Sequence, residues 1–349
     1  MPKYSVSQWR YRRRGIVILG LALLLVIIFA TAFGSVRIPF LDGIRIVAGK
    51  LPFFNPEASW PDAYETIIFN IRLPRALLAG LVGAALAAAG ATYQGLFRNP
   101  LADPYLIGVS QGAALGAVIG ILLPAATLSL GQWVTPVMAF SGALIATVAV
   151  YSLARIGKMV PVTTLILAGV ALGALLSSIV SYLIISSGDK VHEIVFWLMG
   201  SLSMSRWEEV RIVFPYILVG LGVLIIYARP LNIMQLDEEQ ARQLGVNVER
   251  LKIILLGAAT LITAAAVSFV GTIGFVGIIV PHAVRLVWGP DHRFLLPLSM
   301  LSGAVFLILA DLVARMVLAP TELPIGVITA ICGAPFFLYL LRRRKSVIF

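Results

Sequence analysis

The chain has 349 residues and a net charge of +11, and 60% of its residues are hydrophobic while only 12% are charged. A soluble domain has about a quarter of its residues charged and cannot bury so much apolar side chain, so a soluble enzyme, a nucleic-acid-binding protein and a disordered chain are excluded. The single cysteine, Cys332, excludes a framework of disulfide bonds. The composition predicts an all-α membrane protein that forms one domain over residues 1–349.

Apolar segments recur along the chain at the length that a membrane requires, because about 20 helical residues cross roughly 30 Å of hydrocarbon. No charge marks two of the boundaries between segments. We place these two at 124–132, where Pro, Thr, Ser and Gly gather, and at 271–274, which contains two glycines. Ten predicted spans result: 15–34, 76–97, 105–123, 133–154, 160–188, 212–228, 253–270, 274–288, 294–310 and 323–341.

The first span has a second interpretation as a secretory signal peptide. It follows Arg12, Arg13 and Arg14, and the sequence Ala30-Thr31-Ala32 near its end is similar to a cleavage site. Its apolar run is longer than the core of a typical signal, and nine more spans follow it. We therefore expect it to stay in place as a transmembrane helix.

Ten spans place both termini on the same side of the membrane, together with 18 of the 27 Lys and Arg residues. Lys and Arg are enriched in cytoplasmic loops, so we expect both termini in the cytoplasm. The positive charge then reflects topology, and no nucleic-acid partner is expected.

The cytoplasmic stretch 229–252 is much longer than a turn requires. Acidic residues at 237–239 precede Arg242 at helical spacing, and Gly245 suits the end of a helix. The stretch predicts one or two short helices outside the membrane, with an apolar side formed by Met234, Leu236, Ala241 and Leu244. A solvated surface helix without a partner is the alternative.

Polar features on the outward side are the amphipathic region 189–211, which we expect at the membrane interface, and three arginines. Arg72, Arg75 and Arg315 lie near span ends, where an arginine most often anchors a helix in the membrane. Asp311 is spaced to pair with Arg315. The functional alternative is a positive outer rim that faces an acidic partner.

Motifs for catalysis and for metal or nucleotide binding are missing from the sequence. Gly49-Lys50 and Gly157-Lys158 are followed by Leu51 and Met159, so neither forms a phosphate loop. Metalloprotease, nucleophile-elbow and Cys/His metal motifs are also missing, so we expect no catalytic residue, no metal site and no cofactor in this chain. Ionisable residues are nearly absent from the middle of the spans, which argues against an ion-coupled carrier.

Several motifs in order carry a family resemblance. They are RLPR (72–75), LVGAALAAAGATYQGLFRNPLADPYLIGVSQGAALG (81–116), LILAGVALG (165–173), FWLMGSL (196–202), LDEEQARQLGV (236–246), GTIGFVGIIVPHAVRLVWGPDHRFLLP (271–297) and LADLVARMVLAPTELPIGVITAICGAPFFLYLL (309–341). Over residues 15–345 the chain resembles the permease subunits of bacterial type II ABC importers for iron chelates, haem and cobalamin, the FecCD family.

The resemblance implies ten helices per subunit and a homodimer, or a heterodimer with a close paralogue, in membrane lipid. It implies that this membrane is the cytoplasmic (inner) membrane of a bacterium. It also implies two cytoplasmic ABC ATPase subunits, which would bind ATP and Mg, and an extracytoplasmic substrate-binding protein. The spans 160–188 and 323–341 would line or flank the pathway.

The resemblance also assigns roles to individual residues. Arg72, Arg75 and Arg315 match arginines that dock the binding protein. The loop formed by Val160, Pro161, Val162, Thr163 and Thr164 matches the cytoplasmic gate. The residues that match the ATPase-coupling helices are Leu236, Asp237, Glu238, Glu239, Ala241, Arg242, Leu244 and Gly245.

Two other classes of function are weighed against an importer subunit. A secondary carrier predicts charged or broken helices near the membrane centre in both halves, and the sequence shows none. An intramembrane enzyme needs a nucleophile and a base or a metal set, which His282 alone cannot provide. Within the importer family, an iron chelate is the expected substrate because it is the commonest one, with a corrinoid next.

Overall fold

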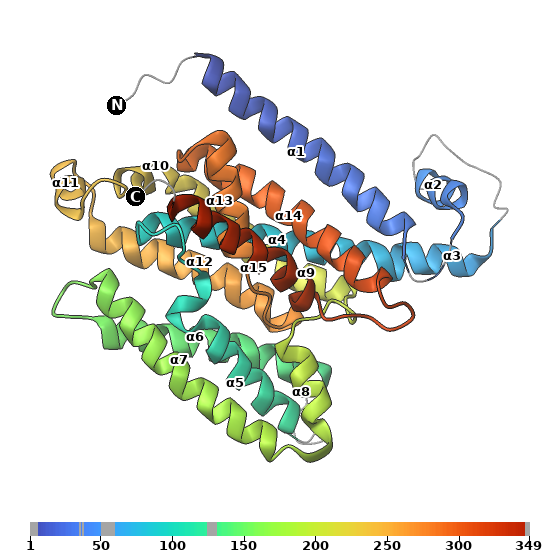
Figure 1. Cartoon of the computed structure of the whole chain (residues 1–349). Coiled ribbons are helices and arrows are strands. Elements are labelled where there is room, and N and C mark those ends of the chain that lie inside the picture. The colour runs from blue at the N-terminus through green and yellow to red at the C-terminus, as the bar shows by residue number, and fades with distance from the viewer. Residues whose placement is uncertain (1–5, 35, 37, 50–59, 124–130, 346–349) are drawn as a thin grey trace.

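The structure is a computed structural model that describes residues 6–34, 36, 38–49, 60–123 and 131–345. These residues form helices and contain no β-strand, apart from one isolated bridge between Ile156 and Met159. The α-helices are α1 (Val6–Ala32), α2 (Phe40–Ala48), α3 (Asp62–Thr66), α4 (Leu73–Leu96), α5 (Val109–Leu122), α6 (Val134–Ala154), α7 (Val162–Ile185), α8 (Val191–Leu198), α9 (Trp207–Ile226), α10 (Ala228–Ile233), α11 (Glu238–Gln243), α12 (Val248–Val270), α13 (Val276–Trp288), α14 (His292–Met316) and α15 (Ile325–Lys345) (Figure 1).

Each of the ten predicted spans contains one of these helices, which confirms the all-α class. Seven helical stretches are long and apolar enough to cross a membrane: 9–32, 62–96, 131–154, 162–185, 207–226, 248–270 and 292–316. The other three predicted spans hold the shorter apolar helices α5, α13 and the apolar part of α15. Ten membrane crossings therefore stay a prediction. Most of the predicted break at 124–132 lies outside the described residues.

Irregular backbone delays the beginning of two of the predicted spans. The sequence predicts helices from 105 and 274, but α5 begins at Val109 and α13 at Val276. Gly108, Gly271 and Phe275 have positive φ angles of 82°, 72° and 70°, which a continuing helix does not allow. Irregular backbone that the sequence interpretation did not anticipate therefore precedes both helices.

Tyr105 joins these two irregular segments. Its hydroxyl donates to the carbonyl of Ile273 at 2.9 Å and accepts from the amide of the same residue at 3.1 Å. Polar backbone groups inside a membrane protein must be bonded internally, because lipid offers them no partner. One tyrosine thus satisfies the backbone of the segment that precedes α13.

Helix α4 lies at the centre of the bundle, where it packs against α14, α12 and α13. In the helical stretch 62–96, which contains α4, 78% of the most apolar 18 residues are buried. In α7 only 17% of the corresponding residues are buried. Small residues allow this packing: a Cβ added at Gly83 would lie 2.2 Å from the carbonyl oxygen of Gly303 in α14, and one at Gly90 would lie 1.9 Å from that of Gly277 in α13. The backbones of α4, α13 and α14 are therefore in direct contact.

Gly83→Ala is expected to destabilise the protein by about 1–3 kcal/mol, because the added methyl group must push two helices apart. Gly222→Ala is the matched control, since a Cβ at Gly222 has no atom within 4 Å. The measurement is the temperature at which half of the detergent-solubilised protein loses its monodisperse chromatographic peak. Equal temperatures for the two variants would contradict the close contact between α4 and α14.

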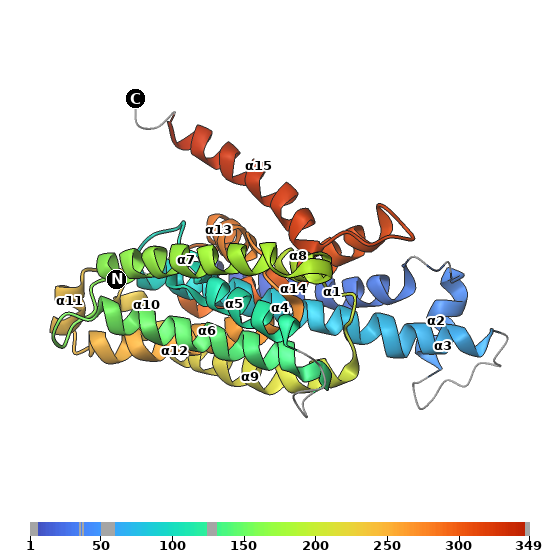
Figure 2. The same ribbon diagram turned by 90° about the horizontal axis from the view of Figure 1, so that it is seen from below.

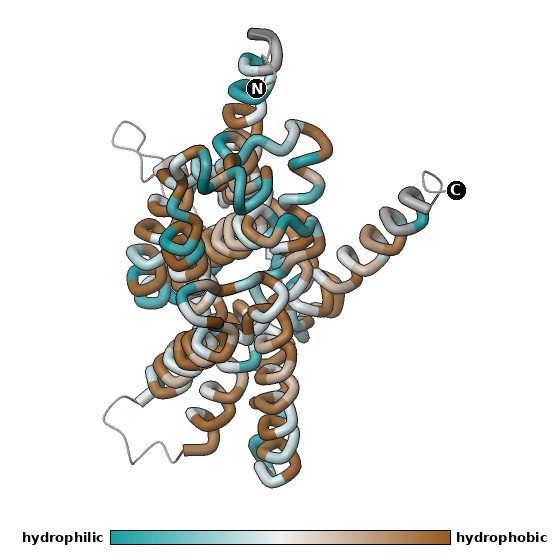
Figure 3. Tube along the Cα trace, turned by 90° about the vertical axis from the view of Figure 1, so that its left-hand side faces the viewer, coloured by the Kyte–Doolittle hydropathy of each residue, from teal (hydrophilic) through white to brown (hydrophobic). Residues whose placement is uncertain are grey.

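The two ends of the bundle differ in their elements. The helices α10 and α11, the beginning of α1 and the end of α15 lie at one end, and α2 and α3 lie at the other (Figure 1). Figure 3 looks at the first end, where hydrophilic stretches lie among the apolar helices. We call this end the α11 end and the opposite one the α2 end.

Candidate functional site

The predicted coupling stretch 229–252 forms two short helices at the α11 end, α10 and α11, as the charge pattern indicates. The carboxylate of Asp237 accepts a hydrogen bond from the amide of Glu238 at 2.7 Å and caps the start of α11. Gly245 has a φ of 82° and follows the helix, as expected for a C-terminal glycine. Glu239 and Arg242 are exposed on the outside of α11.

The predicted apolar side of this stretch is correct for only half of its members. Met234 and Ala241 are buried, with 1% and 0% of their surface exposed, whereas Leu236 and Leu244 are 47% and 61% exposed. The reason is the shortness of α11, which covers residues 238–243 only. The two leucines lie beyond its ends and are left as exposed apolar side chains.

The predicted gate loop lies between α6 and α7 at the same end. Its turn is closed by backbone hydrogen bonds between Ile156 and Met159, of 2.9 Å and 3.1 Å. Pro161 then precedes α7, of which Val162 and Thr163 are the first two residues. The hydroxyl of Thr164 donates to the carbonyl of Pro161 at 2.9 Å and to that of Ala154 at 3.0 Å, so it ties α7 to the end of α6.

Charged side chains connect the coupling stretch to the gate loop. The ammonium of Lys252 lies 2.8 Å from a carboxylate oxygen of Glu238 and 3.0 Å from the carbonyl oxygen of Val160. Glu249 accepts a hydrogen bond from the amide of Val160 at 3.1 Å and forms an ion pair with Arg242 at 3.5 Å. The structure thus brings two of the three predicted functional regions together.

Lys252 and Glu249 are functional candidates that the sequence interpretation missed. Both lie in the stretch 229–252, but the sequence interpretation assigns neither of them a role of its own. The signal was a Glu and a Lys three residues apart at the beginning of the long apolar helix α12, where two charges on one face must find partners. Their partners in α11 and in the gate loop come from distant parts of the chain and show only in the structure.

Helix α10 is attached to the start of α14 by a second polar network. The amide of Asn232 donates to Asp291 at 2.7 Å and accepts from the backbone amide of His292 at 2.8 Å. Arg12 of α1 forms an ion pair with Asp291 at 3.4 Å. Burial favours a higher pKa for Asp291, but the hydrogen bonds from Arg293 and Asn232 outweigh it and lower the pKa. Asp291 therefore stays charged and joins α1, α10 and α14.

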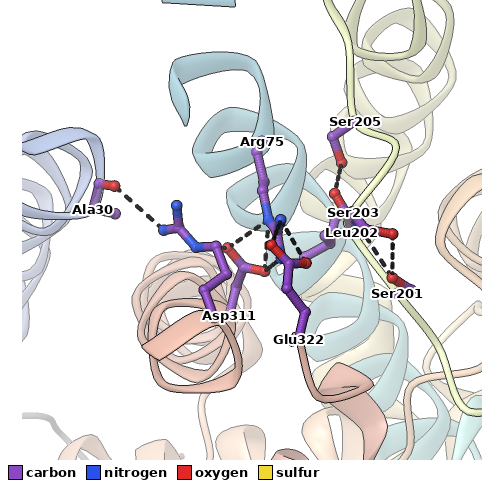
Figure 4. A network of polar contacts seen from close by, with 9 residues as sticks. Ala30, Arg75, Ser201, Leu202, Ser203, Ser205, Asp311 and Glu322 are labelled. Atoms are coloured by element: carbon purple, nitrogen blue, oxygen red, sulfur yellow. Dashed lines mark hydrogen bonds and ion pairs between the residues drawn. The ribbon is translucent and has the colours of Figure 1, made fainter. Parts of the chain in front are cut away.

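The three predicted docking arginines lie together near the α2 end and are paired within the chain. Arg75 bonds to both carboxylate oxygens of Asp311 at 3.0 Å and 3.1 Å and to Glu322 at 2.9 Å (Figure 4). Arg315 lies 3.1 Å from Asp311, as its i,i+4 spacing predicts. Arg72 donates to the carbonyls of Thr31 and Ala32 and so caps the C-terminus of α1.

The prediction that these arginines form an exposed positive patch is wrong for this structure. Arg72, Arg75 and Arg315 have only 3%, 6% and 4% of their surface exposed, because neighbouring helices cover them and acids of the same chain neutralise two of them. Docking of a binding protein by these residues stays a prediction, and it requires their present partners to be released.

No group of three His, Cys, Asp or Glu side chains is arranged to hold a metal ion within the part of the chain that the structure describes. The ring of His292 is bonded to Asn232 at 2.9 Å. The rings of His192 and His282 lie against Phe196 and Phe336, at centroid distances of 6.4 Å and 6.5 Å.

Residues 22–343 match the family model of the FecCD transport family. The chain belongs to this family. It is similar to the cobalamin import system permease protein BtuC of Halobacterium salinarum, with 53% identity over 310 residues that cover 86% of this chain and 82% of the relative. It is also similar to the hemin transport system permease protein HmuU of Yersinia pestis, with 42% identity over 287 residues that cover 82% and 86%.

A solved structure has the same fold. It is described as an inward-facing conformation of a metal-chelate type ABC transporter, and it matches with a TM-score of 0.80 and 32% identity over 95% of this chain and 99% of the solved one. This FecCD-family chain is thus an integral membrane protein for transport and belongs to a family of permease subunits, not of enzymes.

Proposed function

We propose that the chain is the permease subunit of an ATP-binding-cassette importer that moves a corrinoid into the cytoplasm. The observation that carries this proposal is the 53% identity to a cobalamin import permease. Two separate ATPase subunits supply the energy, and an extracytoplasmic binding protein delivers the substrate. In this proposal the α11 end faces the cytoplasm, in agreement with the distribution of Lys and Arg.

The ATPase is proposed to bind α11 and its flanking leucines. Leu236 and Leu244 are exposed on either side of α11, whose outer surface carries Glu239 and Arg242. Exposed apolar side chains rimmed by polar ones are typical of protein–protein contacts. The loop Val160–Thr164, which Lys252 and Glu249 hold beside α11, is proposed as the cytoplasmic gate.

A second copy of the chain is proposed to cover α7 and α15. Helix α15 projects away from the body of the bundle (Figure 2). Both helices expose large apolar side chains, namely Leu167, Val170, Leu175, Tyr182 and Ile185 of α7 and Ile331, Leu338 and Tyr339 of α15. In this proposal the substrate pathway lies between the two copies, lined or flanked by these two helices.

An iron chelate is the second candidate substrate, favoured by the 42% identity to a hemin permease. This order reverses the expectation drawn from the family resemblance, which rests on how common iron chelates are as substrates of the family. The permease itself offers little to separate the two classes, because in this proposal the substrate is selected by the binding protein.

The test is uptake by proteoliposomes that contain the chain with its cognate ATPase and binding protein. We expect ATP-dependent uptake of cyanocobalamin and none of hemin or ferric citrate. Uptake of hemin or ferric citrate alone would support the second candidate. Uptake that needs an ion gradient and no ATP would instead identify a secondary carrier and contradict both.

The purified chain alone is expected to hydrolyse no ATP, because it contains no run of residues that cradles a triphosphate. Phosphate release is measured for the chain alone and for the chain with its cognate ATPase subunits. Hydrolysis by the chain alone, in a preparation that mass spectrometry shows to be free of other ATPases, would contradict the proposal.

A further inference from the structure

The ammonium of Lys252 is buried and is bonded to protein groups instead of water. Its side chain is only 3% exposed, and three acceptors surround it: Glu238 at 2.8 Å, the carbonyl oxygen of Val160 at 3.0 Å and Glu249 at 3.5 Å. An ammonium group has three protons to donate, so these acceptors match its full capacity. A buried charge without such partners is strongly disfavoured. Movement of any of the three acceptors away from Lys252 therefore costs free energy unless Lys252 moves with it.

Val160 is held by both of its backbone polar groups. Glu249 accepts from its amide at 3.1 Å, and Lys252 donates to its carbonyl at 3.0 Å. Both side chains belong to the beginning of α12, and Val160 itself is 2% exposed. Since Val160 and Pro161 lead directly into α7, the position of α7 is tied to the first turns of α12.

Helix α11 holds the same two side chains from the other side. Glu238 is its first residue and binds Lys252, and Arg242, one turn later, binds Glu249 at 3.5 Å. Arg242 also lies 3.8 Å from the sulfur of Met159 in the gate loop. A displacement of α11 therefore breaks charge pairs unless α12 and the gate loop follow it.

We propose that Lys252 and Glu249 are positioning residues that transmit movement of α11 to the gate loop and so to α7. We call Glu238, Arg242, Glu249 and Lys252 the Lys252 clamp. This inference rests on the proposed function, in which an ATPase moves α11. It adds the residues by which that movement reaches the loop.

The first experiment measures cyanocobalamin uptake per ATP hydrolysed by the reconstituted importer. For Lys252→Met and Glu249→Gln we expect assembled complexes that still hydrolyse ATP, with uptake per ATP about tenfold lower, a size usual for coupling between two sites. Arg250→Met is the matched control, because Arg250 is an exposed cation of the same helical turn. Lys252→Arg keeps the charge and is expected to restore most of the coupling. Wild-type uptake per ATP in Lys252→Met would overturn the inference.

The second experiment needs neither ATPase nor substrate, so it tests the clamp even if the wild-type importer fails to transport and the proposed function falls. Spin labels replace the exposed residues Lys158 and Gln243 in a Cys332→Ser chain in nanodiscs. We expect a narrow distribution of distances between them, which Glu249→Gln broadens and Arg250→Met does not. A merely stabilising role would lower the unfolding temperature and leave the distribution unchanged, and this result would overturn the inference.

Discussion

Arg75→Glu is expected to lower the free energy of unfolding by about 3–5 kcal/mol, because it breaks a buried ion pair and adds a third carboxylate to Asp311 and Glu322. The side chain of Arg75 is 7% exposed and that of Asp311 is 1% exposed, so water cannot compensate for the lost pairing. Arg211→Glu, which reverses an exposed charge, is the control. The measurement is the temperature at which the detergent-solubilised protein loses its monodisperse peak.

The same variant decides how docking experiments are to be interpreted. If Arg75→Glu unfolds the chain, its failure to bind a substrate-binding protein says nothing of docking. If the variant keeps the stability of the control but binds the partner more weakly, Arg75 leaves Asp311 and Glu322 to reach the partner. That outcome would contradict the structural role assigned here and support docking.

Ala241→Pro is expected to reduce transport at least about tenfold while the chain still inserts in the membrane. The amide of Ala241 donates to the carbonyl of Asp237 at 2.8 Å, and proline has no proton to donate. Proline in a helix interior costs about 3 kcal/mol or more, which a helix of six residues cannot absorb. Loss of α11 also removes the positions from which Glu238 and Arg242 reach Lys252 and Glu249.

Two further variants test whether the loss of transport follows the loss of helix stability in α11. Gln243→Ala changes an exposed residue of the same helix and is expected to transport normally. Ala241→Gly weakens the helix without removing the hydrogen bond, at a cost of about 1 kcal/mol, and is expected to fall between the two. Normal uptake by Ala241→Pro proteoliposomes would show that α11 is a passive surface helix.

The long helices were predictable because their cause is local. Twenty or more uncharged, mostly apolar residues in a row define α1 or α7 without knowledge of any neighbour. The late beginning of α13 was not predictable in this way. Phe275 has a φ of 70°, which phenylalanine rarely adopts, and it does so where the irregular segment before it is bonded to Tyr105 from a distant part of the chain.

In the candidate site, too, local features were predictable from the sequence and long-range contacts were not. Glu238 and Glu239 of α11 lie four and three residues before Arg242, so the sequence indicates the helix. The sequence does not show which side chains the charged residues of the site contact, because these partners come from distant parts of the chain. Arg75 meets Asp311 and Glu322 from 236 and 247 residues away, which turns an expected surface patch into a buried ion-pair cluster. Lys252 likewise needs Val160, which lies 92 residues before it.

The contacts at Gly83 and Gly90 have a mechanical consequence. Packed helices slide past one another by small rotations of the side chains between them. At Gly83 and Gly90, α4 meets the backbones of α14 and α13 directly, since a Cβ added there would come within 2.2 Å and 1.9 Å of a carbonyl oxygen. One helix therefore cannot rotate or slide past the other at these two points unless their backbones first separate.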